Sequence, residues 1–475
     1  MKPLADELLE VLGPAGVIRE PTRLLPYESD ALAMVAVRPE LVILPRDTLQ
    51  TAAAMRILHR RKVPVVARGA GTGLAGGATP VAGGVVLSTA RMRDVLALDP
   101  LDRLARVQAG VVNVDLTGAC KHADLLYAPD PSSQMACTIG GNVANNSGGP
   151  HCFKYGATTR HVLGLVIVQH DGEILDLSEP VLDPAGYDLA GLFVGSEGTF
   201  GVATEIVVKL SPAPEVIEVQ LGLFRSLDAA CDAVSDMIAA RLEPAALEIL
   251  DQLTIDAVER SVFAAGYPRE AEAVLLVELE GCAADVAAQA ADVHAILARH
   301  APLEVRTARD AAARKKLWAG RKGAFGAMGR IAPDLYVADA VVPRTKLRQL
   351  VARTVEICRE RRLRLATVFH AGDGNLHPNI CYDRRDSDEV RRVVEAGHLI
   401  LEECIAAGGA LTGEHGVGLE KLPEMELYFT PTDLAAACRV RAAWDPDTRL
   451  NPGKLVPSHA CLEIRGASLP TEGAP

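Results

Sequence analysis

A run of five glycines within ten positions constrains the fold of this 475-residue chain more than any other feature. The run is Arg68-Gly69-Ala70-Gly71-Thr72-Gly73-Leu74-Ala75-Gly76-Gly77, and apolar stretches at 63–67 and 85–88 predict strands on both sides of it. Glycines let the backbone approach a ligand and present successive N–H groups to an anion. We therefore expect a diphosphate-binding loop between two strands. A flexible linker is the alternative, which the flanking strands and the side chains of Arg68 and Thr72 disfavour.

Two further clusters of small and hydrogen-bonding residues lie in the same half of the chain. One extends from Asp130-Pro131-Ser132 to Ser147-Gly148-Gly149, and the other is Gly195-Ser196-Glu197-Gly198-Thr199-Phe200-Gly201. Either cluster alone would predict an ordinary turn. Three glycine-rich clusters in one domain favour long loops that wrap a large cofactor with polar and aromatic parts.

The pattern of strands and helices predicts an α+β protein with four consecutive parts. A strand at 42–44, a helix capped by Asp47 or Thr48, a hairpin around Asp171-Gly172 and a strand at 202–210 come before Ser211-Pro-Ala-Pro214, which interrupts the pattern. Strands and helices resume after it with a partly antiparallel arrangement. We expect an N-terminal helical segment (1–35), a glycine-rich domain (36–215), a second domain (216–430) and a C-terminal segment (431–475).

Charge and apolar content exclude several classes of protein. The 49 Lys and Arg residues against 61 Asp and Glu residues leave a formal charge of −12, which disfavours binding to nucleic acid or to an anionic membrane surface. We predict no membrane span and, because acidic residues interrupt the N-terminal helix, no signal peptide, hence a cytoplasmic protein. The ten cysteines form no C-x-x-C pair, so no iron–sulfur or zinc-ribbon motif is indicated.

Two histidines and a Glu-His pair lie in glycine-framed loops of the second domain. Phe369-His370-Ala-Gly-Asp-Gly-Asn-Leu-His377 crosses a turn, which excludes the single helix of H-E-x-x-H proteases, and Glu414-His415 lies between Gly413 and Gly416. A strand and turn can direct both imidazoles and Glu414 to one divalent ion, for which Zn, Mn and Fe are all suitable. His415 is then left as a general base. A metal-dependent hydrolase is an alternative that leaves the three glycine clusters unexplained.

A basic segment supplies a candidate anchor for an anionic substrate. Arg321 in Leu317-Trp-Ala-Gly-Arg-Lys322 has a planar fork that can hold a carboxylate through two hydrogen bonds. The alternative is a solvated basic helix face, shared with Arg314, Lys315 and Lys316.

The glycine clusters and the late Asn451-Pro-Gly-Lys454 resemble the FAD-binding domain of the PCMH-type flavoproteins of the vanillyl-alcohol-oxidase superfamily. The resemblance implies a two-subdomain FAD-binding domain followed by an α+β cap domain with a largely antiparallel sheet. No histidine lies between residues 60 and 121, so we expect non-covalent FAD. The implied FAD-binding residues are Arg68, Gly69, Ala70, Gly71, Thr72, Gly73, Leu74, Pro131, Ser132, Gly140, Gly141, Asn142, Ser147, Glu197, Gly198, Val202 and Asn451.

The histidine loops and residues 317–344 are similar to the FAD-dependent D-2-hydroxyacid dehydrogenases, within them to the glycolate oxidase branch. The resemblance implies His370, His377 and Glu414 as metal ligands, Asn379 as a substrate contact and His415 as the base. The branch that oxidises a dicarboxylate carries Tyr-Lys-Tyr-Asp where this chain has Tyr336-Val-Ala-Asp339, which favours glycolate or D-lactate, with Tyr336 expected at the pocket.

The same resemblance implies partners for this chain. They are a second FAD-fold subunit and an iron–sulfur subunit, and it allows a peripheral position at the inner face of the cell membrane through those subunits. Two alternatives remain: a stand-alone D-lactate dehydrogenase, and a non-catalytic FAD-binding assembly subunit.

Overall fold

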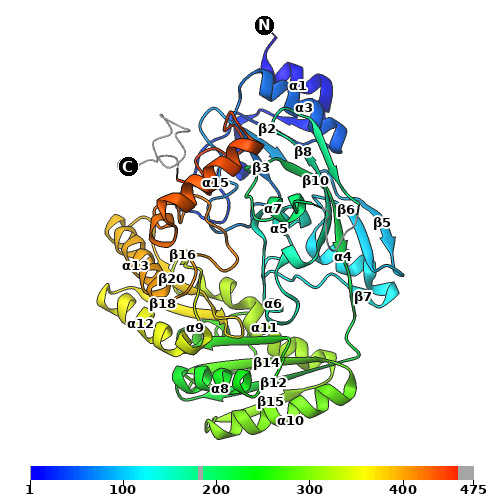
Figure 1. The fold of residues 1–475 in the computed structure, drawn as a ribbon. Helices are drawn as coiled ribbons and strands as arrows, with labels where there is room; N and C mark the ends of the chain where they lie inside the picture. Colours follow the sequence, from blue (N-terminus) through cyan, green and yellow to red (C-terminus); the bar gives the residue numbers. More distant parts are fainter. Residues whose placement is uncertain (1, 180–185, 458–475) are drawn as a thin grey trace.

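The computed structural model describes residues 2–179 and 186–457, and the end of the expected C-terminal segment, 458–475, lies outside them. The described chain forms an N-terminal domain (residues 2–212) and a cap domain (residues 216–430), to whose junction the chain returns after residue 430 (Figure 1). The α+β class predicted from the sequence is confirmed. No helix of the described residues is both long and apolar enough to cross a membrane.

The first sheet of the N-terminal domain carries the first glycine cluster at the end of one strand. Its strand order is β1 (Val17–Ile18), β2 (Leu41–Ile43), β4 (Val85–Ser88) and β3 (Val65–Arg68), with β2, β4 and β3 parallel. Helix α3 (Thr48–Arg60) begins after Asp47, whose carboxylate accepts the Gln50 N–H at 2.8 Å. Helix α1 (Leu4–Leu12) and α3 cover this sheet with apolar residues.

The second sheet of the N-terminal domain is antiparallel throughout. Its order is β5 (Val95–Asp99), β6 (Leu104–Gln108), β10 (Val202–Lys209), β8 (Val162–Val168) and β9 (Ile174–Leu177). Strands β8 and β9 form the predicted hairpin, in which Gly172 adopts a φ of +87°. Helix α5 (Ile139–Asn145), from the second glycine cluster, packs against β10.

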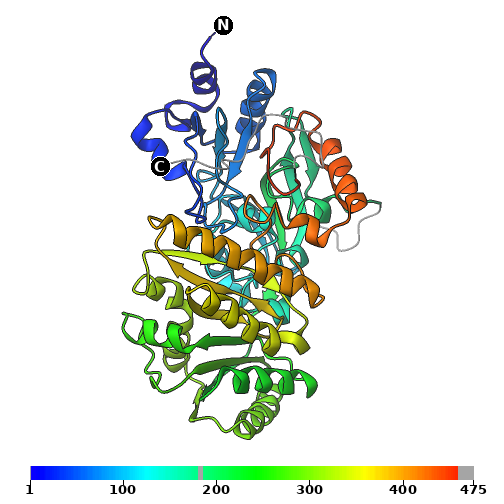
Figure 2. The same cartoon turned by 90° about the vertical axis from the view of Figure 1, so that its left-hand side faces the viewer.

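The cap domain is one nine-stranded sheet between two layers of helices (Figures 1 and 2). Its main order is β15 (Glu304–Ala308), β12 (Val216–Phe224), β14 (Ala273–Gly281), β13 (Ala246–Asp251), β18 (Arg364–His370), β19 (Asn375–Leu376) and β17 (Ala340–Val341). Strand β20 (Pro378–Tyr382) joins β18 to β16 (Asp334–Val337). All these pairs are antiparallel, which confirms the expected largely antiparallel cap.

The two helical layers of the cap have different roles. Helices α8 (Leu227–Ala239), α10 (Ala283–Arg299), α12 (Leu347–Glu360) and α13 (Ser387–Ala406) share one apolar core with the sheet. Helices α9 (Gln252–Glu259) and α11 (Ala311–Met328) pack on the other face. Phe325 of α11 reaches the cavity described below, so this second face is the one directed toward the N-terminal domain.

The chain returns to the N-terminal domain through α15 (Pro431–Trp444), shown in orange-red in Figure 1. The Trp444 ring stacks on Phe200 with a centroid distance of 5.2 Å, and Leu450 forms a parallel bridge with Val65 of β3. This return places residues 450–455 beside the first glycine cluster.

Candidate active site

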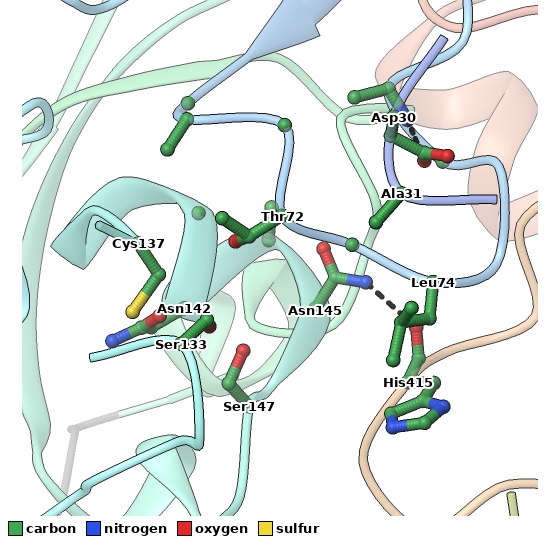
Figure 3. A pocket seen from close by; sticks show the side chains of 18 of the residues that line it. Asp30, Ala31, Thr72, Leu74, Ser133, Cys137, Asn142, Asn145, Ser147 and His415 are labelled. Atoms are coloured by element: carbon green, nitrogen blue, oxygen red, sulfur yellow. Dashed lines mark hydrogen bonds between the residues drawn. The ribbon is translucent and has the colours of Figure 1, made fainter. Parts of the chain in front are cut away.

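A cavity of about 560 Å³ lies where the two sheets of the N-terminal domain and the cap domain meet. Residues of all three glycine clusters line it, as do His377, Glu414 and His415 of the cap domain. Figure 3 shows Thr72, Asn142, Ser147 and His415 around this space. The structure thus brings together the two groups of residues that the sequence predicts as separate sites.

Sixteen of the seventeen residues expected at FAD line this cavity. They are Arg68, Gly69, Ala70, Gly71, Thr72, Gly73, Leu74, Pro131, Ser132, Gly140, Gly141, Asn142, Ser147, Glu197, Gly198 and Val202. Asn451, the remaining one, lies behind the cavity wall.

Close backbone packing explains two of the glycines. A Cβ on Gly140 would lie 2.9 Å from the Ala109 carbonyl oxygen, and one on Gly69 would lie 2.5 Å from the Thr138 hydroxyl. That hydroxyl caps α5 by accepting the Gly141 N–H. Gly69 therefore lets the first cluster approach the second, whereas Gly140 lets α5 lie directly against the backbone at Ala109.

Arg68 does not direct its charge at a free anion site. Its guanidinium donates to the carbonyl oxygens of Ser29 at 2.8 Å and Pro26 at 3.2 Å, and it is largely buried. The same segment is held by Asp30, whose carboxylate accepts the Ala78 N–H at 3.2 Å. Arg68 thus anchors residues 26–30 to the first glycine cluster, and backbone N–H groups are left as the groups that would hold a diphosphate.

The C-terminal return fastens the same cluster from behind. The Asn451 amide donates to the carbonyl oxygens of Gly77 at 2.8 Å and Glu197 at 2.6 Å. The Lys454 ammonium is fully buried and donates to the carbonyl oxygens of Gly77 and Thr79 and to the Asn451 side chain. Burial lowers the pKa of Lys454 to about 7. Asn451 therefore acts on the cavity through the backbone of the first and third clusters.

His370, His377 and Glu414 form a compact set of donor atoms. Glu414 Oε1 lies 3.2 Å from His370 Nε2 and 3.2 Å from His377 Nε2. A tetrahedral ion with bonds of about 2.0–2.2 Å separates its ligand atoms by about 3.4 Å. Both ring nitrogens of His377 are buried and have no hydrogen-bond partner among the described residues. The set therefore fits a divalent ion, and His377 is the ligand that most needs one.

The pKa shifts of His370 and Glu414 are those expected of oppositely charged groups that lie close together, and His415 shows a different shift. Burial opposes charge on all three groups, but the carboxylates of Glu248 and Glu414 raise the pKa of His370 well above its ordinary value. In the same way, burial is outweighed by the two imidazoles, which lower the pKa of Glu414 well below its ordinary value. Burial lowers the pKa of His415 to about 4, so its imidazole is neutral at pH 7 and can accept a proton.

Asp339 organises the loop that carries Glu414 and His415. Its Oδ2 accepts the Thr412 hydroxyl at 2.5 Å, the N–H groups of Gly413 and His415 at 2.9 and 3.2 Å, and the Lys421 ammonium at 3.1 Å. Its Oδ1 has no hydrogen-bond partner among the described residues and lies 3.6 Å from His377 Nε2. Asp339 is the last residue of the segment Tyr336-Val-Ala-Asp339 discussed above, but the sequence alone does not reveal its role in this loop.

The N-terminal domain holds the same loop from the opposite side. Glu197 accepts the N–H groups of Val417 and Gly418 at 2.7 and 2.8 Å, and Asn145 donates to the His415 carbonyl oxygen at 2.9 Å (Figure 3). Glu197, expected at FAD, therefore uses its carboxylate to bind the cap domain. Asn145 was missed as a site residue, although it belongs to the second glycine cluster.

Three residues expected at the substrate are not among those lining the cavity. Arg321 is 2% exposed, and its Nε is hydrogen-bonded to Glu248, one layer behind the wall. Asn379 is fully buried on β20 and donates to the His377 carbonyl oxygen at 2.8 Å. Tyr336 is directed to α13, whereas its neighbours Leu335 and Val337 line the cavity, as strand alternation requires.

Comparison with known proteins extends over nearly the whole chain. The family models that match are an FAD binding domain over residues 39–178 and the C-terminal domain of FAD linked oxidases over residues 213–455. The chain is 46% identical over 449 residues to glycolate oxidase subunit GlcD of Escherichia coli K12, covering 94% of this chain and 90% of that protein. It is 32% identical to a D-lactate dehydrogenase of Anaerostipes hadrus, covering 90% and 92%.

A solved structure shows the same fold at low sequence identity. p-Cresol methylhydroxylase with substrate bound matches with a TM-score of 0.81 and 17% identity, over 97% of this chain and 96% of that one.

Proposed function

Because the chain belongs to the FAD-linked oxidases and is a flavoprotein oxidoreductase, we propose that it oxidises a small 2-hydroxy acid, glycolate or D-lactate, by hydride transfer to FAD. The products are glyoxylate and pyruvate. We further propose that FAD is bound non-covalently and that His370, His377 and Glu414 hold a divalent ion of Zn, Mn or Fe.

One observation carries this proposal. His377, Glu414 and His415 line the same cavity as sixteen residues expected at FAD. One expected metal-ligand imidazole (His377), the expected ligand carboxylate (Glu414) and the neutral base His415 thus face the space that receives the cofactor, and His370 lies behind them, with its Nε2 3.2 Å from Glu414 Oε1. A metal-dependent hydrolase does not require a large cofactor cavity joined to its metal ligands. A non-catalytic FAD-binding subunit does not require the ligand-type residues and the base in that cavity.

The proposed mechanism uses the residues as follows. When bound, FAD supplies a hydride acceptor and the divalent ion a Lewis acid for a substrate oxygen. His415 takes the hydroxyl proton at Nε2, because its Nδ1 is buried in the protein interior. Asp339, Asn145 and Glu197 keep the His415 loop in place from both domains.

The cap wall of the cavity favours a short monocarboxylate. Besides His377, Glu414 and His415, the cap domain contributes Phe325, Pro333, Asp334, Leu335 and Val337, and none of these described cap residues is a Lys or an Arg. A second carboxylate on the substrate would find no cation there. Arg321 is held by Glu248, so we assign it no direct grip on the substrate.

Reduction of the bound flavin tests the proposal. The purified protein should show a visible flavin band that bleaches anaerobically on addition of glycolate or D-lactate. After treatment with a chelator the band should persist, whereas bleaching should stop until Zn²⁺, Mn²⁺ or Fe²⁺ is restored. A flavin band that neither substrate bleaches would overturn the proposed activity, and bleaching that survives complete metal removal would overturn the metal site alone.

The E. coli relative is named a subunit, which supports the proposal that this chain also works in a complex. We propose a second FAD-fold subunit and an iron–sulfur subunit as its partners, with electrons passing from FAD to the latter. The D-lactate dehydrogenase relative supports a second candidate, a stand-alone enzyme. Purification from the native organism separates them: a fully active homomer without an iron–sulfur companion would support the second.

A further inference from the structure

A buried carboxylate stands directly behind the proposed metal ligands. Glu248, at the centre of β13, is completely buried and does not line the cavity. Its Oε1 lies 2.6 Å from His370 Nδ1, and its Oε2 accepts a hydrogen bond from Arg321 Nε. Burying a carboxylate is costly unless it is paired and hydrogen-bonded, so these two partners are what make the position tenable.

Sheet register explains why Glu248 meets His370. Strands β13 and β18 are antiparallel neighbours, and Glu248 and His370 are directly opposite each other. Residues that are opposite in such a pair direct their side chains to the same face of the sheet. The contact therefore rests on the rigid centre of the cap sheet rather than on a loop.

The hydrogen bond determines which nitrogen of His370 carries the proton. An ionised carboxylate can only accept, so Nδ1 must donate to Glu248. In the neutral imidazole this leaves Nε2 without a proton, and Nε2 is the atom that lies 3.2 Å from Glu414. His377 has no equivalent support, because neither of its ring nitrogens has a hydrogen-bond partner among the described residues.

We propose that Glu248 is a positioning residue for the metal site: it orients the His370 ring and keeps its Nε2 free to bind the ion. Arg321, in turn, holds Glu248 and compensates its charge. The inference rests on the proposed function, since it presupposes an ion at His370, His377 and Glu414. It gives Arg321 a different role from that expected of a substrate anchor.

Zn²⁺ binding to the FAD-loaded full-length protein tests this inference without recourse to turnover. Glu248→Gln keeps the volume of the side chain but presents an amide that no longer enforces the Nδ1 tautomer. Loss of such a supporting carboxylate should weaken Zn²⁺ binding by about 10–100-fold, measured by competition with a chromophoric chelator after metal removal. The flavin spectrum should be unchanged.

Glu278→Gln is the matched control. Glu278 lies on the neighbouring strand β14, is buried, and bonds a histidine, His151, at 2.9 Å, but contacts none of the proposed ligands. This variant should bind Zn²⁺ as the wild type does. Wild-type affinity in Glu248→Gln, or an equal loss in Glu278→Gln, would overturn the role assigned to Glu248.

Two further arms separate this inference from the proposed function. If the wild type and His370→Gln both fail to bind Zn²⁺ specifically, the metal site itself is absent and the inference falls with it. If His370→Gln abolishes binding and Glu248→Gln does not affect it, only the inference fails. Should Glu248→Gln not accumulate as folded protein, Glu248→Asp is titrated instead. It keeps the charge near Arg321 but withdraws it from His370, and the same weakening is expected.

Discussion

Replacing Glu197 by glutamine should loosen the loop that presents Glu414 and His415 to the cavity. The Glu197 carboxylate accepts two backbone N–H groups, from Val417 at 2.7 Å and Gly418 at 2.8 Å. A glutamine has a single carbonyl oxygen and can accept only one of them. Its amide group would then face the other N–H, which places two donors against each other in a buried position.

The magnitude follows from these contacts. Losing a hydrogen bond to a charged group costs about 1.5–3 kcal/mol, and leaving a buried N–H unpaired costs about 1–3 kcal/mol. Burial raises the pKa of Glu197, because the buried carboxylate carries a desolvation penalty. The neutral glutamine avoids that penalty, which offsets part of the loss in the free energy of unfolding. We therefore expect the free energy of unfolding to fall by about 2–3 kcal/mol, with reduced kcat and unchanged FAD content.

Urea unfolding followed by circular dichroism, together with anaerobic flavin reduction by glycolate, measures both effects. Glu205→Gln is the control: Glu205 also accepts a hydrogen bond, from Arg106 at 2.8 Å, but it is partly exposed and distant in sequence from the 414–418 loop. Its replacement should cost less than about 1 kcal/mol. If Glu197→Gln unfolds within about 0.5 kcal/mol of the wild type and turns over normally, the reasoning is refuted.

Three other substitutions test separate parts of the site. His415→Ala should lower kcat by about 10²–10⁴-fold with FAD still bound, and normal turnover would show that another group takes the proton. Gly140→Ala should purify with little FAD, because its Cβ would lie 2.9 Å from the Ala109 carbonyl oxygen; a wild-type flavin spectrum would contradict this. His151 lies between Asp130 at 2.7 Å and Glu278 at 2.9 Å; although burial opposes its charge, these carboxylates raise the pKa of His151 well above its ordinary value. Its stabilising charge is present below about pH 6.5 and is lost as the pH rises through the folded-state pKa. The destabilisation caused by His151→Gln in urea unfolding should thus shrink toward alkaline pH, and a pH-independent difference would rule the explanation out.

Sequence reasoning succeeded where the deciding interactions are local. The Asp47 cap and the hairpin at Gly172 involve residues only a few positions apart. The glycine clusters are recognisable because close backbone approach admits no other residue, as at Gly140. These signals suffice for the class of fold and for the residues that line the cofactor cavity.

Sequence reasoning failed where the direction of a side chain depends on strands that are distant in the sequence. Alternation along β16 separates Tyr336 from Leu335 and Val337, but the sequence does not say which face meets the cavity. Glu197 meets a loop about 220 positions away, for which no local pattern exists. Glu248 had one available signal: it is a carboxylate in the middle of a strand, directly between the apolar Leu247 and Ile249, and such a position indicates a buried charge with a partner.

The return of the chain to the first glycine cluster has a consequence for biosynthesis. Asn451 and Lys454 bind the carbonyl oxygens of Gly77 and Thr79, more than 370 positions earlier in the chain. A ribosome must therefore have synthesised the chain past residue 454 before these bonds can form. Capture of the cofactor is thus expected to follow translation, so nascent chains stalled before residue 450 should emerge without stably bound flavin.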